Sequence, residues 1–298
     1  MSGDGILYLV ATPIGNLEDI TARATRILRE ASVIACEDTR RTRGLLAHLG
    51  LQTPTVSLHE HNERARIPQI LAMLRDGKSV AVVTDAGTPA ISDPGAALVA
   101  EAVRAGFRVV PIPGASAVTA AVAVADFSAD RFAFVGFLPR RRTERKRMLQ
   151  SLAGLPMALV LFEAPHRVRE TLADMEEVLG ARRMLLAREL TKVYEEVRRG
   201  TVAEVRASLG ETLKGEITLV VEGAAAPSTR RGGAPREETA QEDRGPEAAM
   251  HASPEEFVKV LLARGLSRRD AARALAAAYR LPARRAYRIA AGARGGEA

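Results

Sequence analysis

Two loops that follow apolar runs carry the clearest chemical pattern of the sequence. Ala11–Asn16 (Ala-Thr-Pro-Ile-Gly-Asn) comes directly after the run Ile6–Val10, and the eleven residues Asp85–Gly95 come after Val80–Thr84. A third turn, Ile112–Ala117, ends another such run. Ligands of open α/β sheets bind at the carboxyl ends of the strands, and Gly and Pro in these turns let the backbone approach a ligand. Together the loops predict a ligand pocket at one sheet edge, although each alone is compatible with an ordinary turn.

Polar groups at three further places suggest binding chemistry of lower specificity. His59–His61 has the H-x-H spacing of a metal site, but no Cys/His cluster accompanies it, so we expect a polar rim of a substrate cleft and no metal. In Glu163–Arg167, Arg167 is suited to hold a phosphate, whereas His166 is equally suited to begin a helix. Glu37–Arg41 follows a strand-like run, and its acids also suit a helix N-terminus for purely structural reasons.

Strand-like runs alternate with helix-period segments in the first half of the chain, which predicts a largely parallel α/β sheet. The predicted strands are Ile6–Val10, Val33–Cys36, Thr55–Leu58, Val80–Thr84 and Arg108–Ile112. The predicted helices are Thr21–Ala31, Thr39–Leu49, Ala65–Arg75 and Pro94–Ala105. Gly50, Gly77 and Gly106 follow the last three of these as C′ residues, and Asp93 is the expected N-cap of the fourth helix, ahead of Pro94.

A second, less regular series begins near Arg131, so some of its strands should pair antiparallel. Its predicted strands are Phe132–Gly136, Ala158–Phe162, Met184–Arg188, Glu195–Arg199 and Ile217–Val221. Its predicted helices are Thr143–Leu152, Val168–Leu179 and Val202–Leu209. The apolar stretch Ala115–Ala125 is about half the length that spans a bilayer, so we expect a buried helix there and no membrane contact.

The C-terminal part of the chain has a different composition. Residues 224–251 are rich in Pro, Gly, Arg and Glu, which predicts a flexible linker. Helix starts at Ser253, Ser267 and Pro282 then predict three short helices that resemble a helix-turn-helix RNA-binding module, with an Ala-rich structural bundle as the alternative. The expected domains are 1–127 and 128–223, both α/β, followed by the linker 224–251 and the helical module 252–292.

The formal charge of +7 is concentrated in two islands. Residues 251–298 carry ten Lys/Arg against four Asp/Glu, and the run Arg140–Arg147 carries six against one. Both islands fit contact with RNA phosphates, although either alone is also typical of a solvated helix face. Cys36 is the one cysteine and lies in an apolar run, so we expect a buried thiol, no disulfide and a cytoplasmic location. The run Ile6–Ala11 is too short and lacks the basic leader of a secretory signal.

Nine segments together resemble the tetrapyrrole-methylase superfamily. They are Leu7–Ile20 (LYLVATPIGNLEDI), Ile34–Arg40 (IACEDTR), Leu58–Asn62 (LHEHN), Val83–Gly95 (VTDAGTPAISDPG), Val109–Gly114 (VVPIPG), Asp130–Pro139, Leu161–Arg167 (LFEAPHR), Leu186–Lys192 (LARELTK) and Lys214–Gly223 (KGEITLVVEG). The resemblance spans about residues 6–223, and the joint pattern is specific.

This resemblance implies a kidney-shaped pair of α/β domains with S-adenosylmethionine bound in the cleft between them, mainly by backbone atoms. It also implies a homodimer. Carried over by motif, the cofactor-contact candidates are Pro13, Gly87, Ile91, Ser116, Ala117, Phe162 and Leu190. Asp85 opens the same loop as Gly87 and is expected near the positively charged methionine portion.

More narrowly, the chain resembles members that methylate the ribose 2′-hydroxyl of a cytidine in 16S rRNA, a group that separates RNA from DNA. The chemistry implied is direct displacement at a sulfonium methyl, which needs alignment and acceptance of one proton but no metal. Asp38 is a candidate proton acceptor, and Lys192 would lower the hydroxyl pKa or act as the base if its own pKa were depressed. The substrate-contact candidates are Arg40, His61, Asn62, Arg140, Arg141 and Arg167.

Two other functions remain open at this point. The first is a methyltransferase of the same fold that acts on a tetrapyrrole or another small acceptor. The basic islands and the helical module argue against it, since a small acceptor needs neither. The second is a non-catalytic RNA-binding or ribosome-assembly protein, which the elaborate loop Asp85–Gly95 argues against.

Overall fold

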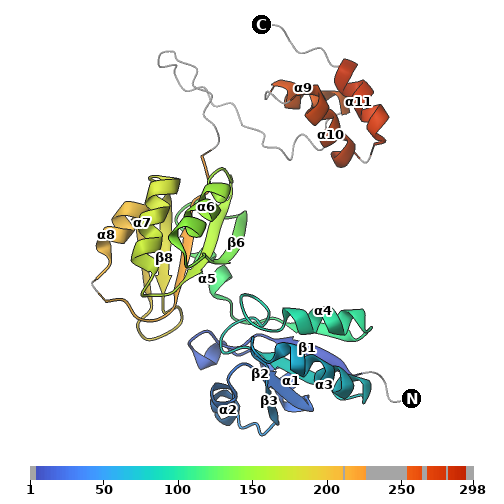
Figure 1. Ribbon diagram of the computed structural model, residues 1–298, viewed down its shortest axis with the longest axis vertical. Helices are drawn as coiled ribbons and strands as arrows, with labels where there is room; N and C mark the ends of the chain where they lie inside the picture. Colours follow the sequence, from blue (N-terminus) through green and yellow to red (C-terminus); the bar gives the residue numbers. More distant parts are fainter. Residues whose placement is uncertain (1–4, 211, 226–253, 264–266, 280, 293–298) are drawn as a thin grey trace. The chain divides into compact units, whose positions relative to one another are not determined.

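The computed structural model in Figure 1 describes residues 5–210, 212–225, 254–263, 267–279 and 281–292. The chain forms two compact units, Met1–Ser228 and Thr229–Ala298. The first unit carries two five-stranded sheets, and the second carries three helices. The predicted linker 224–251 lies outside the described residues from 226 onward, and the bounds of the four predicted segments stay predictions.

The first sheet is parallel, as its strand and helix alternation predicted. Its strands are β1 (Ile6–Val10), β2 (Val33–Cys36), β3 (Thr55–Ser57), β4 (Val80–Val83) and β5 (Arg108–Ile112), in the order β3-β2-β4-β1-β5. The helices are α1 (Ala22–Glu30), α2 (Thr39–His48), α3 (Glu63–Arg75) and α4 (Ala96–Arg104), with a short 3-10 turn, η1 (Leu17–Asp19). β2 and β4 are buried along their whole length, because α1 and α2 pack on one face of the sheet and α3 and α4 on the other. Cys36 is buried, as predicted.

The predicted start of the fourth helix was wrong. α4 begins at Ala96, and its N-cap is Gly95, with φ of 122°, in place of Asp93. The carboxylate of Glu63, at the start of α3, accepts hydrogen bonds from the backbone N–H groups of Gly95 (3.0 Å) and Leu98 (3.2 Å). A side chain 32 positions upstream therefore satisfies the free N–H groups of this helix end, and a local capping pattern does not reveal it.

The second sheet is mixed, as its irregular pattern predicted. Its strands are β6 (Phe132–Phe137), β7 (Ala158–Glu163), β8 (Arg183–Arg188), β9 (Glu196–Thr201) and β10 (Ile217–Val221), in the order β6-β7-β10-β8-β9. β6 and β7 are parallel, and the other three pairs are antiparallel. The helices are α5 (Ala117–Ala123), α6 (Arg142–Leu152), α7 (Val168–Leu179) and α8 (Val202–Ser208). α6, α7 and α8 cover one face, while α5 packs against the other with Val118 and Ala121 buried. None of the helices in the described part of the chain combines the length and the apolar character needed to cross a membrane.

The basic run Arg140–Arg147 is largely neutralised by acids of α7. Arg145 and Asp174 are both 1% exposed, and two guanidinium nitrogens of Arg145 lie 2.7 Å from the Asp174 carboxylate. Arg142 contacts the same carboxylate at 2.9 Å, and Lys146 contacts Glu177 at 2.5 Å. Within the described residues no ion pair engages the side chain of Arg140 or Arg147. Three of its cations therefore hold α6 against α7, and the contact of this run with RNA stays a prediction.

The second unit contains the three predicted helices, α9 (Pro254–Ala263), α10 (Arg268–Ala278) and α11 (Ala283–Gly292). Val258, Leu275 and Ala286 are fully buried in its core, and Ser267 caps α10 by accepting from the backbone N–H of Asp270. Seven exposed cations of this unit have no ion pair among the described residues: Lys259, Arg268, Arg269, Arg273, Arg284, Arg285 and Arg288. This basic surface is compatible with RNA contact, which stays a prediction.

Candidate cofactor pocket

The three predicted loops are joined at the carboxyl edge of the first sheet. Thr12 and Gly87 exchange two backbone hydrogen bonds, of 2.9 and 3.1 Å, and the backbone N–H of Ala11 donates to the carbonyl of Ile112 (3.1 Å). A Cβ atom on Gly114 would lie 3.0 Å from the Cβ of Ala11, so this turn packs directly on the first loop. The loops therefore form one surface built largely of backbone.

The first loop also contacts a loop of the second sheet, residues 189–192 between β8 and β9. The backbone N–H of Asn16 donates to Oγ1 of Thr191 (3.0 Å). A Cβ atom on Gly15 would lie 2.8 Å from this Oγ1 and 2.9 Å from the carbonyl oxygen of Leu190. Only glycine allows such an approach, so Gly15 fixes how the two sheets meet at this edge.

A pocket of about 640 Å³ lies at this junction. From the first sheet it is lined by Ile14, Glu37, Arg41, residues 84–88, residues 91–93 and residues 116–118. From the second sheet it is lined by Phe134, Phe137, residues 162–165 and residues 215–218. Its volume is in the usual range for small-molecule and cofactor sites.

The second sheet supplies an aromatic and aliphatic wall. β10 runs antiparallel to β7, which places Ile217 opposite Glu163 and Thr218 opposite Phe162 at the same sheet edge. The ring of Phe162 lies 5.0 Å from that of Phe134 and 5.7 Å from that of Phe137. Such a wall suits a planar ring that leaves water on binding.

Acidic side chains cluster in the pocket against a single basic lining residue. The pKa of Glu37 is raised by burial and by the nearby charges of Asp85 and Asp93. The pKa of Asp93 is also raised by burial and by Asp85, and a hydrogen bond with Thr84 offsets this only in part. Arg41 contacts Asp85 at 3.3 Å. Since these carboxylates repel one another, a positively charged ligand fits this pocket.

Two loops at the pocket contain residues other than glycine with positive φ. Ala90 (66°) and Ser92 (63°) lie in the loop Asp85–Gly95, and Glu189 (53°) and Thr191 (68°) lie in the loop that contacts Gly15. Such conformations are costly and persist where the surrounding structure holds them, typically at ligand sites. They support a functional role for this junction.

Comparison with known proteins gives the family. The family model for tetrapyrrole (corrin/porphyrin) methylases matches residues 6–206. The chain belongs to this methylase family. A ribosomal RNA small subunit methyltransferase I of Synechocystis sp. is 44% identical over 96% of this chain and 97% of its own length. The protein of the same name from Halalkalibacterium halodurans is 48% identical over 74% of this chain and 76% of its own length.

Solved structures share the methylase fold at lower identity. The uroporphyrin-III C-methyl transferase of Thermus thermophilus, complexed with S-adenosyl homocysteine, has a TM-score of 0.54 at 21% identity, covering 72% of this chain and 97% of that one. A diphthine synthase has a TM-score of 0.57 at 17% identity, covering 73% and 90%. Both likenesses confirm the predicted fold class.

Six of the eight predicted cofactor residues of this methylase line the pocket: Asp85, Gly87, Ile91, Ser116, Ala117 and Phe162. Pro13 and Leu190 do not line it. Pro13 is buried next to Ile14, which does, and Leu190 packs against the core between α5 and the sheet while its carbonyl lies behind Gly15. These two residues therefore lie next to the pocket loops without lining the pocket.

Neither predicted catalytic residue lines the pocket. Asp38 caps α2 through the backbone N–H of Arg40 (2.8 Å), and its contacts with Arg40 lower its pKa to about 2, so it is a weak base at neutral pH. Burial opposes the charge of Lys192, but hydrogen bonds to Glu189 (2.8 Å) and Glu216 (3.2 Å) outweigh it and raise its pKa. The depressed pKa that a lysine base requires is therefore not present.

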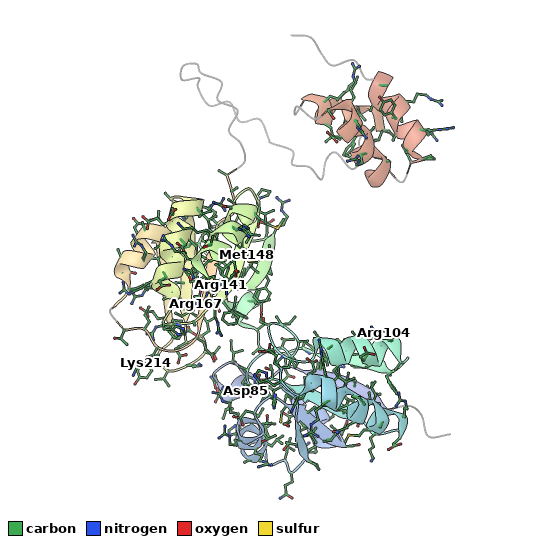
Figure 2. All side chains as sticks on the ribbon, in the orientation of Figure 1. Asp85, Arg104, Arg141, Met148, Arg167 and Lys214 are labelled. Carbon is green, nitrogen blue, oxygen red and sulfur yellow. The ribbon has the colours of Figure 1, made fainter. Side chains whose placement is uncertain are left out.

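The predicted substrate residues divide into two groups, and none of them lines the pocket. Arg40 pairs with Asp38, while Asn62 accepts from the backbone N–H of His59 (2.9 Å) and holds a turn beside the exposed His61. Beside the second sheet, Arg141 at the start of α6 lies near Glu144 (3.5 Å), and Arg140 and Arg167 line a separate pocket; Arg141 and Arg167 are labelled in Figure 2. Among the residues that the structure describes, no three His, Cys, Asp or Glu side chains are grouped to hold a metal ion.

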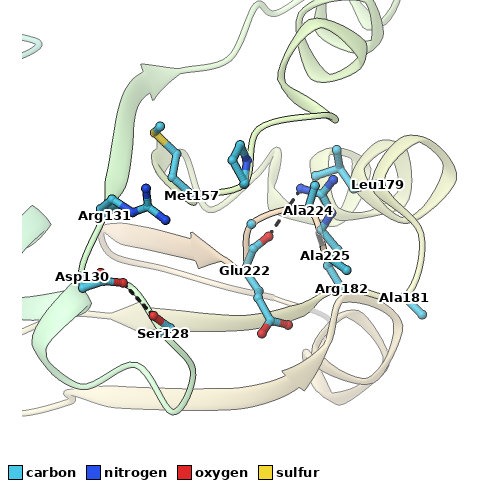
Figure 3. Close-up of a pocket in the computed structure, with 12 residues that line it drawn as sticks. Ser128, Asp130, Arg131, Met157, Leu179, Ala181, Arg182, Glu222, Ala224 and Ala225 are labelled. Atoms are coloured by element: carbon cyan, nitrogen blue, oxygen red, sulfur yellow. Dashed lines mark hydrogen bonds between the residues drawn. The ribbon is translucent and has the colours of Figure 1, made fainter. Parts of the chain in front are cut away.

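Sequence reasoning missed Glu37, Asp93 and the aromatic pair Phe134 and Phe137 as pocket residues. A signal existed for Glu37, because it directly follows β2 at the same sheet edge, but acids at a helix start are common for structural reasons. A further pocket of about 510 Å³, shown in Figure 3, lies where β10 ends and contains no predicted site residue. There Ser128 bonds to Asp130 (2.7 Å), and Arg182 bonds to the carbonyl of Glu222 (3.4 Å).

Replacing Asp93 with Asn is expected to stabilise the free protein while weakening S-adenosylmethionine binding about ten- to a hundredfold, because the pocket loses one of the carboxylates that attract a cationic ligand. The pKa of Asp93 is raised in the folded state, so its ionised form opposes folding, and stability rises as pH falls through that raised pKa. Thermal unfolding between pH 8 and pH 5 and calorimetric titration of the cofactor measure both effects. Asp76→Asn, at an exposed position, is the control. A variant that loses both stability and affinity would show that Asp93 is structural.

Proposed function

We propose that this chain transfers a methyl group from S-adenosylmethionine to the 2′-hydroxyl of a cytidine in 16S rRNA of the small ribosomal subunit. The observation that carries the proposal is the relative named ribosomal RNA small subunit methyltransferase I, which matches 96% of the chain, including the part beyond the family domain. The pocket supplies the physical support, because its lining suits the methyl donor.

The pocket residues fit S-adenosylmethionine in charge and polarity. The clustered carboxylates of Glu37, Asp85 and Asp93 favour a cationic ligand, and the Phe134–Phe162 wall favours its planar ring. When bound, S-adenosylmethionine would supply a methyl group on positively charged sulfur. The ribose oxygen would bond to this methyl as the carbon–sulfur bond breaks with its electron pair on sulfur, and the hydroxyl proton would pass to solvent water.

The protein contributes alignment and charge to this reaction. The joined loops around Thr12, Gly87 and Gly114 hold the donor site rigid, which makes the transfer effectively unimolecular. Of the two predicted catalytic residues, we retain Lys192 as a cation that favours ionisation of the 2′-hydroxyl, since its ammonium group contacts Glu216 on the pocket lining. Its contribution is electrostatic.

RNA binding is assigned to the exposed cations of the helical unit. Their phosphate contacts would be independent of sequence and would weaken with salt. We also propose a cytoplasmic location and a homodimer, for which the exposed side chains of Val193 (93%) and Tyr194 (75%) are a surface that a second copy would cover.

The second candidate is methylation of a tetrapyrrole, which the family description and the name of the Thermus thermophilus protein favour. The basic helical unit favours RNA over a tetrapyrrole as the methyl acceptor, because binding a small acceptor does not require such a unit.

Incubation with tritiated S-adenosylmethionine and either 30S subunits lacking the modification or a tetrapyrrole precursor tests the proposal. We expect label in 16S rRNA and 2′-O-methylcytidine in its nucleoside digest by mass spectrometry. Label confined to the tetrapyrrole would overturn the proposal, as would the absence of transfer to either acceptor despite cofactor binding.

A further inference from the structure

A second pocket of about 700 Å³ adjoins the first, and the two share Phe137 and Ala164 in their linings. It lies where β6 and β7 end side by side. Its lining residues are Phe137, Leu138, Pro139, Arg140, Ala164, His166, Arg167 and Glu170. We call it the acceptor pocket, and the first the donor pocket.

The two pockets differ in charge. The donor pocket has several carboxylates against Arg41, whereas the acceptor pocket has Arg140 and Arg167 against Glu170. Glu170 lies 3.7 Å from the buried Arg145, so part of its charge is already balanced. An anionic ligand is therefore favoured on one side of Phe137 and a cationic ligand on the other.

Arg140 and Arg167 have different roles in the acceptor pocket. Arg167 is mostly buried, donates to the carbonyls of Leu138 (3.0 Å) and Pro139 (3.1 Å), and faces Glu163 at 3.5 Å. It is thus a positioning residue that holds the loop carrying Phe137 and Arg140. The Arg140 side chain is exposed and makes no hydrogen bond or ion pair within the described residues, so its guanidinium is available to a ligand.

We infer that the acceptor pocket holds the target nucleotide, with its base against Phe137 and its phosphate on Arg140. This inference rests on the proposed function. Phe137 is 54% exposed, and its ring packs against that of Phe162. An exposed aromatic ring that is held in place in this way is suited to stack on an unpaired base. The ribose then lies at the wall shared with the donor pocket, where its 2′-hydroxyl faces the methyl group.

The test compares Arg140→Ala with Arg29→Ala and Arg147→Ala in methylation of 30S subunits over a range of salt concentrations. Arg29 is a matched control, because it is an exposed cation that lines none of the pockets described above and makes no hydrogen bond or ion pair within the described residues. We expect Arg140→Ala to lower kcat/KM about tenfold or more, with the Kd of S-adenosylmethionine unchanged. The slope of log kcat/KM against log salt should fall in magnitude by about one, as expected for one lost phosphate contact.

The companion variants Phe137→Ala and Phe137→Tyr test stacking: the first should lose activity on 30S subunits, and the second should retain it within about threefold. An Arg140→Ala enzyme equal to Arg29→Ala overturns the inference while leaving the proposed function intact, since the wild type still methylates rRNA. Equal losses in Arg140→Ala and Arg147→Ala also overturn it, because a diffuse basic surface would then explain both. If the wild type does not methylate rRNA, that result overturns the proposed function and, with it, the inference that rests on it.

Discussion

Replacing Asp174 with Asn is expected to lower the free energy of unfolding by about 3–5 kcal/mol, because it removes the only buried counter-charge among the described ion pairs of Arg145 and leaves the exposed Glu170. Asp174 and Arg145 are both almost fully buried, and Arg142 donates to the same carboxylate. Burial opposes ionisation of Asp174, but hydrogen bonds from Arg142 and Arg145 outweigh it and lower its pKa. The stability it contributes is therefore present above the ordinary pKa of an aspartate and is lost as pH falls through the lowered value.

Urea unfolding at neutral and acidic pH measures this effect, and Glu177→Gln is the matched control on the same helix. Glu177 pairs with Arg142 and Lys146 but is 57% exposed, so its loss should cost about 0–1 kcal/mol. The double variant Arg145→Met/Asp174→Leu should recover most of the loss, since it removes both buried charges together. A similar small loss in Asp174→Asn and Glu177→Gln would refute the assignment of a buried, structural ion pair.

Replacing Gly15 with Val is expected to lower kcat/KM for methyl transfer about a hundredfold, the scale of a roughly 1 Å misplacement of a reacting group. The new side chain would overlap Thr191 and the carbonyl of Leu190, and it would also meet the Lys192 side chain. The first loop would then separate from the loop at 189–192, and the pocket would lose its shape. Activity on 30S subunits and cofactor titration measure the result.

Gly44→Val is the matched control for this prediction. Gly44 is exposed within α2, and a Cβ atom there has no neighbour within 4 Å. This variant should keep its activity. Full activity in Gly15→Val would show that the contact between the two loops does not shape the site.

The sequence predicted the elements whose causes are local. Five elements have the predicted bounds: β1, β2, β5, β10 and α7. Dense Val/Ile runs identify strands, and apolar residues at helical spacing identify helices, within a few residues of sequence. The start of α4 was missed because its cap comes from Glu63 on another helix. The ion pairs of the basic run on α6 were not predicted, because the acids that pair with it lie about 30 positions away on α7.

The candidate site shows the same division between local and distant causes. The loops after β1, β4 and β5 were predictable, since they follow parallel strands and must meet at one edge. The acidic character of the pocket was not, because it arises when Glu37, Asp85 and Asp93 from two different loops come together. Asp38 and Lys192 were chosen by chemical type. Their partners Arg40 and Glu189 lie only two and three positions away, whereas Glu216, 24 positions from Lys192, is brought to it by the fold.

The position of β10 has a consequence for the order in which the protein is built. β10 is the last strand among the described residues, yet it is the central strand of the second sheet and pairs with both β7 and β8. Its first residues, Ile217 and Thr218, also line the donor pocket. During synthesis from the N-terminus, all five strands of the first sheet have been made once Ile112 has been added. The second sheet and the pocket cannot form until β10 is made, because β10 pairs with strands that are far from it in the chain. The nascent chain therefore acquires its donor pocket only after β10 has been made.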